Sequence, residues 1–282
     1  MKKQIIFAGA GLLLISLLFF LGRTTEPKPA VPTMPAPNAQ AFDIQNFISQ
    51  SKQKLSPSQL VYLSGLENRI SRGDIVNQQV IANTAIAQFW KDSAQLFEPY
   101  AFYISEAAKL DNSEKSLTFA AQILLNNIRG EHDDAKANWE TSLAIELFEK
   151  AIVLDPQNDD LRIGLGSCYV FGKSRNGDPQ ETMKGIQELL GVVRRDSTNM
   201  KAQLVLGVGG YVSGQYDKAI ARLLKVIEKE PTNIEATAFL ADTYAASGNK
   251  TEAIKWYNTS KRLVNNPSYS KEVDERIRLL QQ

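Results

Sequence analysis

The chain has 282 residues, of which 43% are hydrophobic and 22% charged, enough for one elongated domain or two compact ones. Its 32 basic residues are almost balanced by 31 acidic ones, whereas nucleic-acid-binding proteins usually carry a strongly basic surface, so nucleic acid is not expected as a partner. Cys168 is the single cysteine, which excludes an internal disulfide and leaves packing alone to stabilise the fold.

Residues 1–23 predict a signal anchor. An uncharged run of 17 residues, 5–21, follows two lysines, and as a helix it would span about 25 Å, the short end of what crosses a bilayer. Two alternatives are a cleaved signal peptide, which lacks a small-residue cleavage site here, and a helix of a soluble core. The lysines on the N-terminal side slightly outweigh Arg23 and Lys28. We therefore expect a single-pass membrane protein whose bulk lies on the extracytoplasmic, periplasmic side.

Residues 24–41 form a proline-rich linker. Its five prolines disfavour helix and favour an extended polyproline II spacer of up to about 56 Å. The apolar pattern from residue 42 onward is helical, so the fold class is all-α, beginning with an N-terminal helical segment over 42–78. Within it, Ser56-Pro57 predicts a helix start and Arg72-Gly73 the matching stop.

An internal repeat follows. Pairs of a small residue and isoleucine recur at spacings of 41, 34 and 34 residues: Ala144-Ile145, Gly185-Ile186, Ala219-Ile220 and Ala253-Ile254. Twelve residues after the small residue of the first three pairs, a chain break begins: Pro156-Gln157-Asn158, Ser197-Thr198-Asn199 and Pro231-Thr232-Asn233. Gly214 and Gly248 stand where a helical hairpin must turn. Such regularity indicates a stack of similar helical units.

This pattern resembles the tetratricopeptide repeat family, closely over residues 159–267 as three repeats and more loosely over 79–158 as degenerate repeats with an insertion. The resemblance implies a helical-hairpin solenoid of about four to five repeats, closed by a capping helix at 268–282. It also implies close helix contacts in which small residues of the first helices, Gly166, Gly207 and Ala241, face Ala219 or Ala253 of the second helices. About eleven extra residues between Asn126 and Trp139, and seven in 159–199, are expected as insertions, the latter as a loop over 172–179.

Three local features invite a chemical interpretation and are better explained by structure. Gly166 to Ser174 imitates a phosphate-binding loop but has one residue too many, so we expect a helix running into a loop. Glu131 to Asp134 contains the single histidine among carboxylates, and a solvated loop is expected there rather than a metal site. Cys168 is expected to be a buried packing residue. The sequence thus predicts no catalytic residue, metal or cofactor.

The resemblance implies that the chain acts through a partner-binding surface. In the family, positions two, five, nine and twelve of each first helix line an inner groove, and this implies a partner-binding groove that combines an apolar trough with an acidic rim. Its expected residues are Ile163, Val170, Leu204, Val208 and Val212 in the trough and Glu235 and Asp242 at the rim. Such a groove would suit a partner with apolar side chains and a basic residue. The alternative for each apolar position is packing against a neighbouring helix.

Two functions remain open. The first is a membrane-tethered scaffold or adaptor that binds a protein or peptide segment in the groove, in assembly or maturation of an envelope complex, as in the membrane-anchored bacterial envelope proteins that the chain resembles. The second is an enzyme or small-ligand-binding protein whose site is built across the repeats. Since no spacing of acids, bases or nucleophiles indicates catalysis, we expect a scaffold and not an enzyme.

Overall fold

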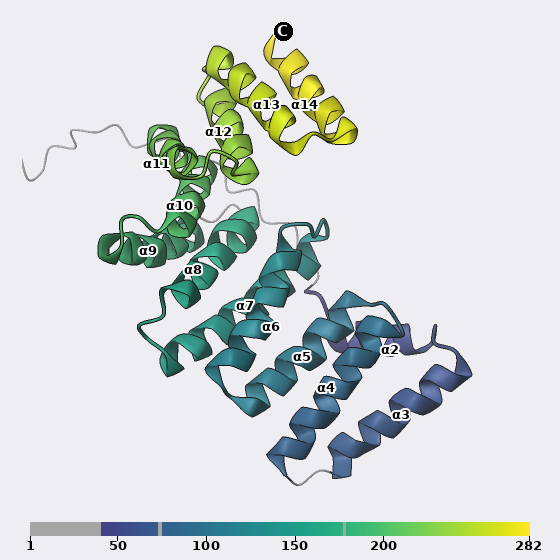
Figure 1. Cartoon of the computed structure of the whole chain (residues 1–282). Coiled ribbons are helices and arrows are strands. Elements are labelled where there is room, and N and C mark those ends of the chain that lie inside the picture. Colours follow the sequence, from purple (N-terminus) through teal and green to yellow (C-terminus); the bar gives the residue numbers. More distant parts are fainter. Residues whose placement is uncertain (1–40, 73–74, 177–178) are drawn as a thin grey trace, which may run out of the picture. The chain divides into compact units, whose positions relative to one another are not determined.

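The computed structural model describes residues 41–72, 75–176 and 179–282 (Figure 1). These residues form helices joined by short turns, and they contain no strand, in agreement with the all-α prediction. The predicted signal anchor and all but the last residue of the predicted linker lie outside the described residues. Within the described ranges, no helix combines the length and the apolar character needed to cross a membrane.

Two helices precede the repeats, α2 (Ile44–Lys52) and α3 (Pro57–Arg72). The start of α3 is capped reciprocally, because the Gln59 N–H donates to Ser56 Oγ at 3.3 Å and the Ser56 N–H donates to Gln59 Oε1 at 2.9 Å. The predicted start of this helix is therefore confirmed, whereas Gly73 of the predicted stop lies outside the described residues. The buried face of the pair packs against α4 and α5 through Ile48, Leu63 and Leu66.

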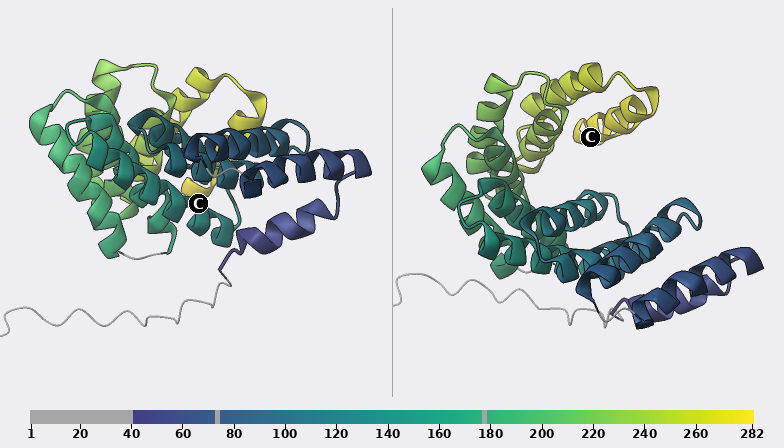
Figure 2. Two further views of the ribbon diagram at one scale, coloured as in Figure 1. Left: turned by 90° about the horizontal axis from the view of Figure 1, so that it is seen from below. Right: turned by 60° about the horizontal axis from the view of Figure 1, so that its bottom comes forward.

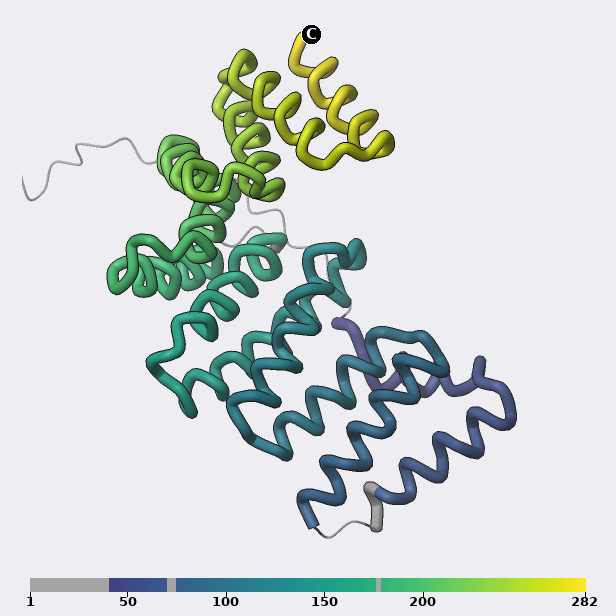
Figure 3. The backbone as a smooth tube through the Cα atoms, viewed as in Figure 1, coloured from purple at the N-terminus to yellow at the C-terminus, as the bar shows by residue number. Residues whose placement is uncertain are grey.

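Helices from residue 76 onward pair as consecutive antiparallel hairpins, visible as the regular zigzag of the tube in Figure 3. The hairpins are α4 (Val76–Asp92) with α5 (Phe97–Asp111), α6 (Glu114–Ile128) with α7 (Asp134–Leu154), α8 (Asp159–Ser167) with α9 (Pro179–Arg195), α10 (Met200–Val212) with α11 (Tyr216–Lys229), and α12 (Ile234–Ala246) with α13 (Lys250–Val264). Helix α14 (Pro267–Leu280) packs on α13 through Val273. The hairpin architecture and the final helix agree with the prediction.

Each predicted chain break ends in the asparagine that caps the next helix. Asn158, Asn199 and Asn233 accept hydrogen bonds on their side chains from the backbone N–H groups of the first turns of α8, α10 and α12. Gly214 and Gly248, between the two helices of their hairpins, have φ values of +71° and +84°, which favour glycine. The repeat in the sequence is thus a repeat of turn chemistry as well as of apolar residues.

In the two irregular units, α6–α7 and α8–α9, most of the extra residues lengthen helices instead of forming loops. Helix α7 begins at Asp134, capped by Asp133, so most of the insertion expected between Asn126 and Trp139 is helical. Helix α8 continues as a π-helical segment, η1 (Cys168–Gly172), and a 3-10 turn, η2 (Lys173–Asn176). The loop expected over 172–179 is therefore helical in its first part, which corrects that prediction.

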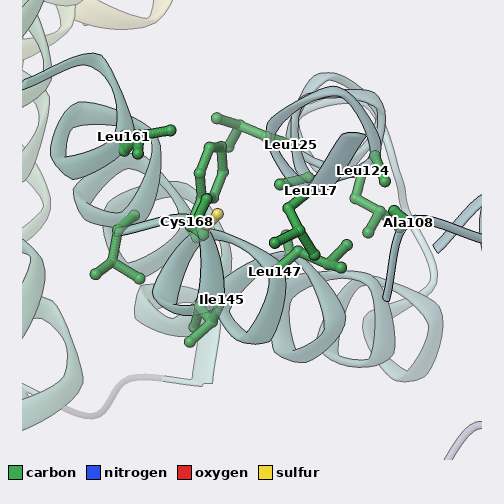
Figure 4. Packing of buried hydrophobic residues seen from close by; sticks show 14 of the residues in the cluster. Ala108, Leu117, Leu124, Leu125, Ile145, Leu147, Leu161 and Cys168 are labelled. Carbon is green, nitrogen blue, oxygen red and sulfur yellow. The ribbon is translucent and has the colours of Figure 1, made fainter. Parts of the chain in front are cut away.

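The interior consists of a series of small clusters. The largest joins α5, α6, α7 and α8 around residues such as Leu117, Leu124, Leu147 and Cys168, all fully buried (Figure 4). Four further clusters follow along the chain in both directions. Each hairpin therefore buries its apolar face mainly against its sequence neighbours, as expected of a solenoid.

Small residues lie at the closest helix contacts, although their pairing differs from the prediction. A Cβ added at Gly210 would lie 3.1 Å from Ala219 Cβ, whereas one at Gly207 would lie 2.8 Å from Leu223 Cγ. Gly166 faces Gly185 and Leu189 of α9. Gly210, and not Gly207, is thus the residue that admits Ala219, because it stands one turn closer to the hairpin turn. Ala241 and Ala253 share one buried cluster, as expected.

The stacked helices from α4 onward follow an arc in the right-hand view of Figure 2. One ion pair spans the inner side of this arc: Arg129, just after α6, and Glu235, in the first turn of α12, are 106 residues apart in sequence. The inner side is formed by the first helices of successive hairpins. Their side chains define the candidate site.

Candidate functional site

A groove with a volume of about 440 Å3 runs along the first helices α6, α8 and α10 and reaches the start of α12. We call it the inner groove and define it by its lining residues. These are Thr118, Gln122, Leu125, Asn126, Arg129, Phe148, Asp160, Ile163, Gly164, Ser167, Phe171, Lys201, Leu204 and Glu235.

The floor of the inner groove is apolar and its sides carry amides and ion pairs. Ile163 and Leu125, each 7% exposed, and the half-buried Leu204 supply apolar surface. On α6, the Gln122 amide donates to Asn126 Oδ1 at 2.9 Å. Between α8 and α10, Lys201 Nζ lies 3.3 Å from Asp160 Oδ1, with both side chains mostly exposed. Such a surface combines apolar contact area with groups that hydrogen-bond a peptide main chain.

The inner groove contains three of the seven residues expected from the sequence, Ile163, Leu204 and Glu235. Val170 and Val208 are each 1% exposed and pack in one cluster with Leu189 and Val192, so a partner cannot reach them in this structure. This corrects their assignment to the groove surface. The alternative, packing against neighbouring helices, describes both.

Val212 is 43% exposed but does not line the inner groove. Counted from the capping asparagine, Val170 stands twelve residues after Asn158, and the matching residue after Asn199 is Tyr211. The predicted stripe was therefore displaced by one residue at its end. Tyr211 is partly buried and its ring centroid lies 6.1 Å from that of Phe239.

The expected acidic rim is neutralised within the protein. Asp242 accepts a hydrogen bond from the Tyr257 hydroxyl at 2.6 Å and pairs with Arg276 of α14 at 2.9 Å. Burial, together with this carboxylate, raises the pKa of Tyr257, so the hydroxyl remains a donor. Glu235 pairs with Arg129. Neither acid is therefore an unpaired receptor for a basic partner.

The sequence interpretation missed the contribution of α6, which supplies Thr118, Gln122, Leu125 and Asn126. The signal was available: Ser113 caps α6, and Thr118, Gln122 and Leu125 follow it at the spacing at which Ile163, Ser167 and Val170 follow Asn158. The degenerate repeat concealed this cap. Phe171 was also missed, because the sequence predicts a loop start where the π-helical segment places an aromatic ring over the groove.

Beside the inner groove lies a second hollow of about 410 Å3, which we call the arginine pocket. It is lined by Ile128, Arg129, Phe171, Arg175, Glu235 and Phe239. The Arg129 guanidinium lies 4.0 Å from the centre of the Phe171 ring. Arg175 donates to the backbone carbonyls of Ile128 and Glu131, at 3.2 and 2.8 Å, and thereby ties the extended α8 to the turn after α6.

The features that imitate chemical motifs have structural roles. The segment from Gly166 to Ser174 is helical, and Lys173 donates to Ser142 Oγ at 2.8 Å. Cys168 is fully buried, and burial raises the pKa of its thiol, which disfavours the thiolate that a nucleophile requires. In the described part of the chain, no group of three histidine, cysteine or carboxylate side chains is placed to hold a metal ion.

Comparison with known proteins identifies the repeats. Residues 213–271 match the family model described as tetratricopeptide repeat. A solved tetratricopeptide repeat protein from Parabacteroides merdae aligns with a TM-score of 0.57 at 13% identity, covering 84% of this chain and 86% of its own. A thermophilic tetratricopeptide repeat protein of Thermus thermophilus aligns with a TM-score of 0.52 at 16% identity, covering 72% and 98%. None of the curated proteins compared with the chain matches it.

Proposed function

We propose that this chain, whose residues 213–271 match the tetratricopeptide repeat family and whose fold is shared with solved proteins of that family, is a scaffold whose inner groove binds an extended segment of a partner protein. The observation that carries this proposal is the composition of the groove. The groove offers an apolar floor, side-chain amides on α6 and ion pairs between its lining residues, and it extends along the three successive first helices α6, α8 and α10. A segment of a partner would bury its apolar side chains on Ile163 and Leu204 and gain specificity from the polar sides.

Replacing Leu204 by aspartate should weaken binding of such a segment at least about tenfold, because the charge would have to be desolvated at the centre of the groove. Peptides selected from a random library on the full-length protein provide the probe, and calorimetry measures their affinity. Leu224→Asp is the matched control, since Leu224 is 37% exposed on α11 and does not line the groove. Equal affinities of the two variants, both folded by circular dichroism, would contradict the groove assignment.

We also propose that residues 5–21 tether this scaffold to a membrane, with the repeats on the extracytoplasmic side, where it would serve assembly or maturation of an envelope complex. The support is the uncharged run of 17 residues and the proline-rich spacer behind it. The partner's identity would distinguish assembly from maturation.

A reporter enzyme that is active only outside the cytoplasm, fused after Gln282, should be active. The intact fusion should remain with the membrane fraction after carbonate washing, because an apolar anchor resists extraction that removes peripheral proteins. Replacing Leu13 and Leu14 by arginine, with the rest of the chain unchanged, is the control that should release it. Recovery of the unaltered fusion in the soluble fraction would refute the tether.

A further inference from the structure

The Arg129–Glu235 ion pair joins parts of the repeat array that are not neighbours. Arg129 follows α6, Glu235 lies in the first turn of α12, and both line the inner groove as well as the arginine pocket. Arg129 donates through both terminal nitrogens, with Nη1 at 3.3 Å from Glu235 Oε2. The two side chains remain 41% and 32% exposed. The pair therefore lies on the surface that a bound segment would cover.

Arg129 is prepared to receive a carboxylate. Its guanidinium carbon lies 4.0 Å from the centre of the Phe171 ring. This stacking fixes the plane of the guanidinium and leaves its N–H edge directed at the Glu235 carboxylate. A planar guanidinium binds a carboxylate through two parallel hydrogen bonds, a geometry that an ammonium group cannot provide. The stacking does not involve Glu235, so the receptor persists when another carboxylate replaces this one.

The charge of the arginine pocket favours an acidic group on the partner over a basic one. Two guanidinium groups, of Arg129 and Arg175, and one carboxylate, of Glu235, line it. Arg175 is held by backbone carbonyls, and its acidic partner, Asp134, has a side chain that is 74% exposed. Once Glu235 moves away, Arg129 has lost its acidic partner, and a basic group of the binding segment would add a positive charge beside both guanidinium groups.

Glu235 can leave at small cost. An exposed ion pair is weak in water, and the first turn of a helix stabilises an unpaired carboxylate. We propose that Glu235 fills the site on Arg129 that an acidic side chain of the partner uses in the complex. The inner groove therefore binds a segment in which aspartate or glutamate stands beside apolar residues. The partner's carboxylate displaces Glu235, which makes Glu235 an internal competitor. This inference rests on the proposed function, and it reverses the partner charge expected from the sequence.

The test uses peptides selected from a random library on the full-length protein and resynthesised with each acidic residue replaced by its amide. We expect selected peptides to be enriched in aspartate or glutamate. Glu235→Gln should bind them up to about fivefold more tightly, because an exposed pair of this kind contributes little free energy. Arg129→Gln should bind the acidic peptide and its amide analogue equally. Glu228→Gln, on the exposed surface of α11, is the matched control and should change nothing.

The other outcomes are distinguishable. Selection of basic peptides, or weaker binding by Glu235→Gln, would overturn the inference. Peptides that depend on Leu204 but discriminate no charge at Arg129 would overturn it while leaving the proposed function intact. Peptides that do not depend on Leu204 would contradict the proposed function itself. Arg129→Lys keeps the positive charge but lacks the two parallel N–H donors of a guanidinium. It should recover only part of the preference for the acidic peptide over its amide analogue, which separates specific recognition of a carboxylate from general charge attraction.

Discussion

Gly185→Ala should lower the free energy of unfolding by about 1 to 3 kcal/mol, although alanine is the better helix former. An added Cβ at Gly185 would lie 2.7 Å from the Gly166 carbonyl oxygen and 2.6 Å from Tyr169 Cβ. The carbonyl belongs to the backbone of α8 and cannot move alone, so α8 and α9 must separate. Thermal unfolding measures the loss as a decrease in Tm of several degrees.

Gly191→Ala, on the same helix, is the control. Its Cβ would meet nothing nearer than Arg195 Nη1 at 3.8 Å, so this variant should gain up to about 1 kcal/mol from helix propensity. Opposite signs for two identical substitutions on α9 would establish that close approach of the paired helices limits stability. A Gly185→Ala protein as stable as Gly191→Ala would show that this contact is looser than described.

Glu140→Gln should stabilise the protein at pH 8 by about 1 to 3 kcal/mol and have little effect at pH 5. Glu140 is fully buried on α7, where Oε1 accepts from the Asn127 amide at 2.9 Å and Oε2 has no hydrogen-bond partner. Burial is the main cause that raises the pKa of this carboxyl to about 7; nearby Glu131 and Glu98 act in the same direction, whereas the hydrogen bond from Asn127 and the charge of Lys136 oppose it. The native state therefore favours the protonated acid.

A raised native pKa contributes stability that is present below the ordinary value of 4.5 and is lost as pH rises through about 7. Glutamine is neutral throughout and removes this loss. Denaturant unfolding at pH 5 and pH 8 measures the difference, and Glu149→Gln, at an exposed position of the same helix, controls for the substitution. A constant difference between Glu140→Gln and wild type at the two pH values would contradict the account.

The sequence sufficed for the hairpins because their turns are chemically explicit. Asn158, Asn199 and Asn233 cap helices, and Gly214 and Gly248 adopt positive φ, so the chain breaks could be predicted to the residue. The irregular units were less predictable. Extra residues can extend a helix as easily as a loop, and only packing selects the π-helical continuation of α8.

The candidate site depended on details that the periodicity does not contain. A helical stripe of positions three or four residues apart contains both groove and core residues, and burial alone separates Leu204 from Val208. The pairing of Arg129 with Glu235 joins residues 106 apart, and no local pattern predicts it. Glu235 and Asp242, the predicted acidic rim, are each paired with an arginine that is distant in sequence, so their charges are neutralised in the fold.

The central claim is that a partner segment lies in the inner groove, and site-specific photo-crosslinking in native cells tests it most directly. A photoreactive amino acid at Gln122 of α6 or at Lys201 of α10, both of which line the groove, should crosslink one partner protein through one segment identified by mass spectrometry. The same probe at Glu228, on α11, should give no such product. Crosslinks of that partner from Glu228 but not from Gln122 or Lys201 would contradict the account.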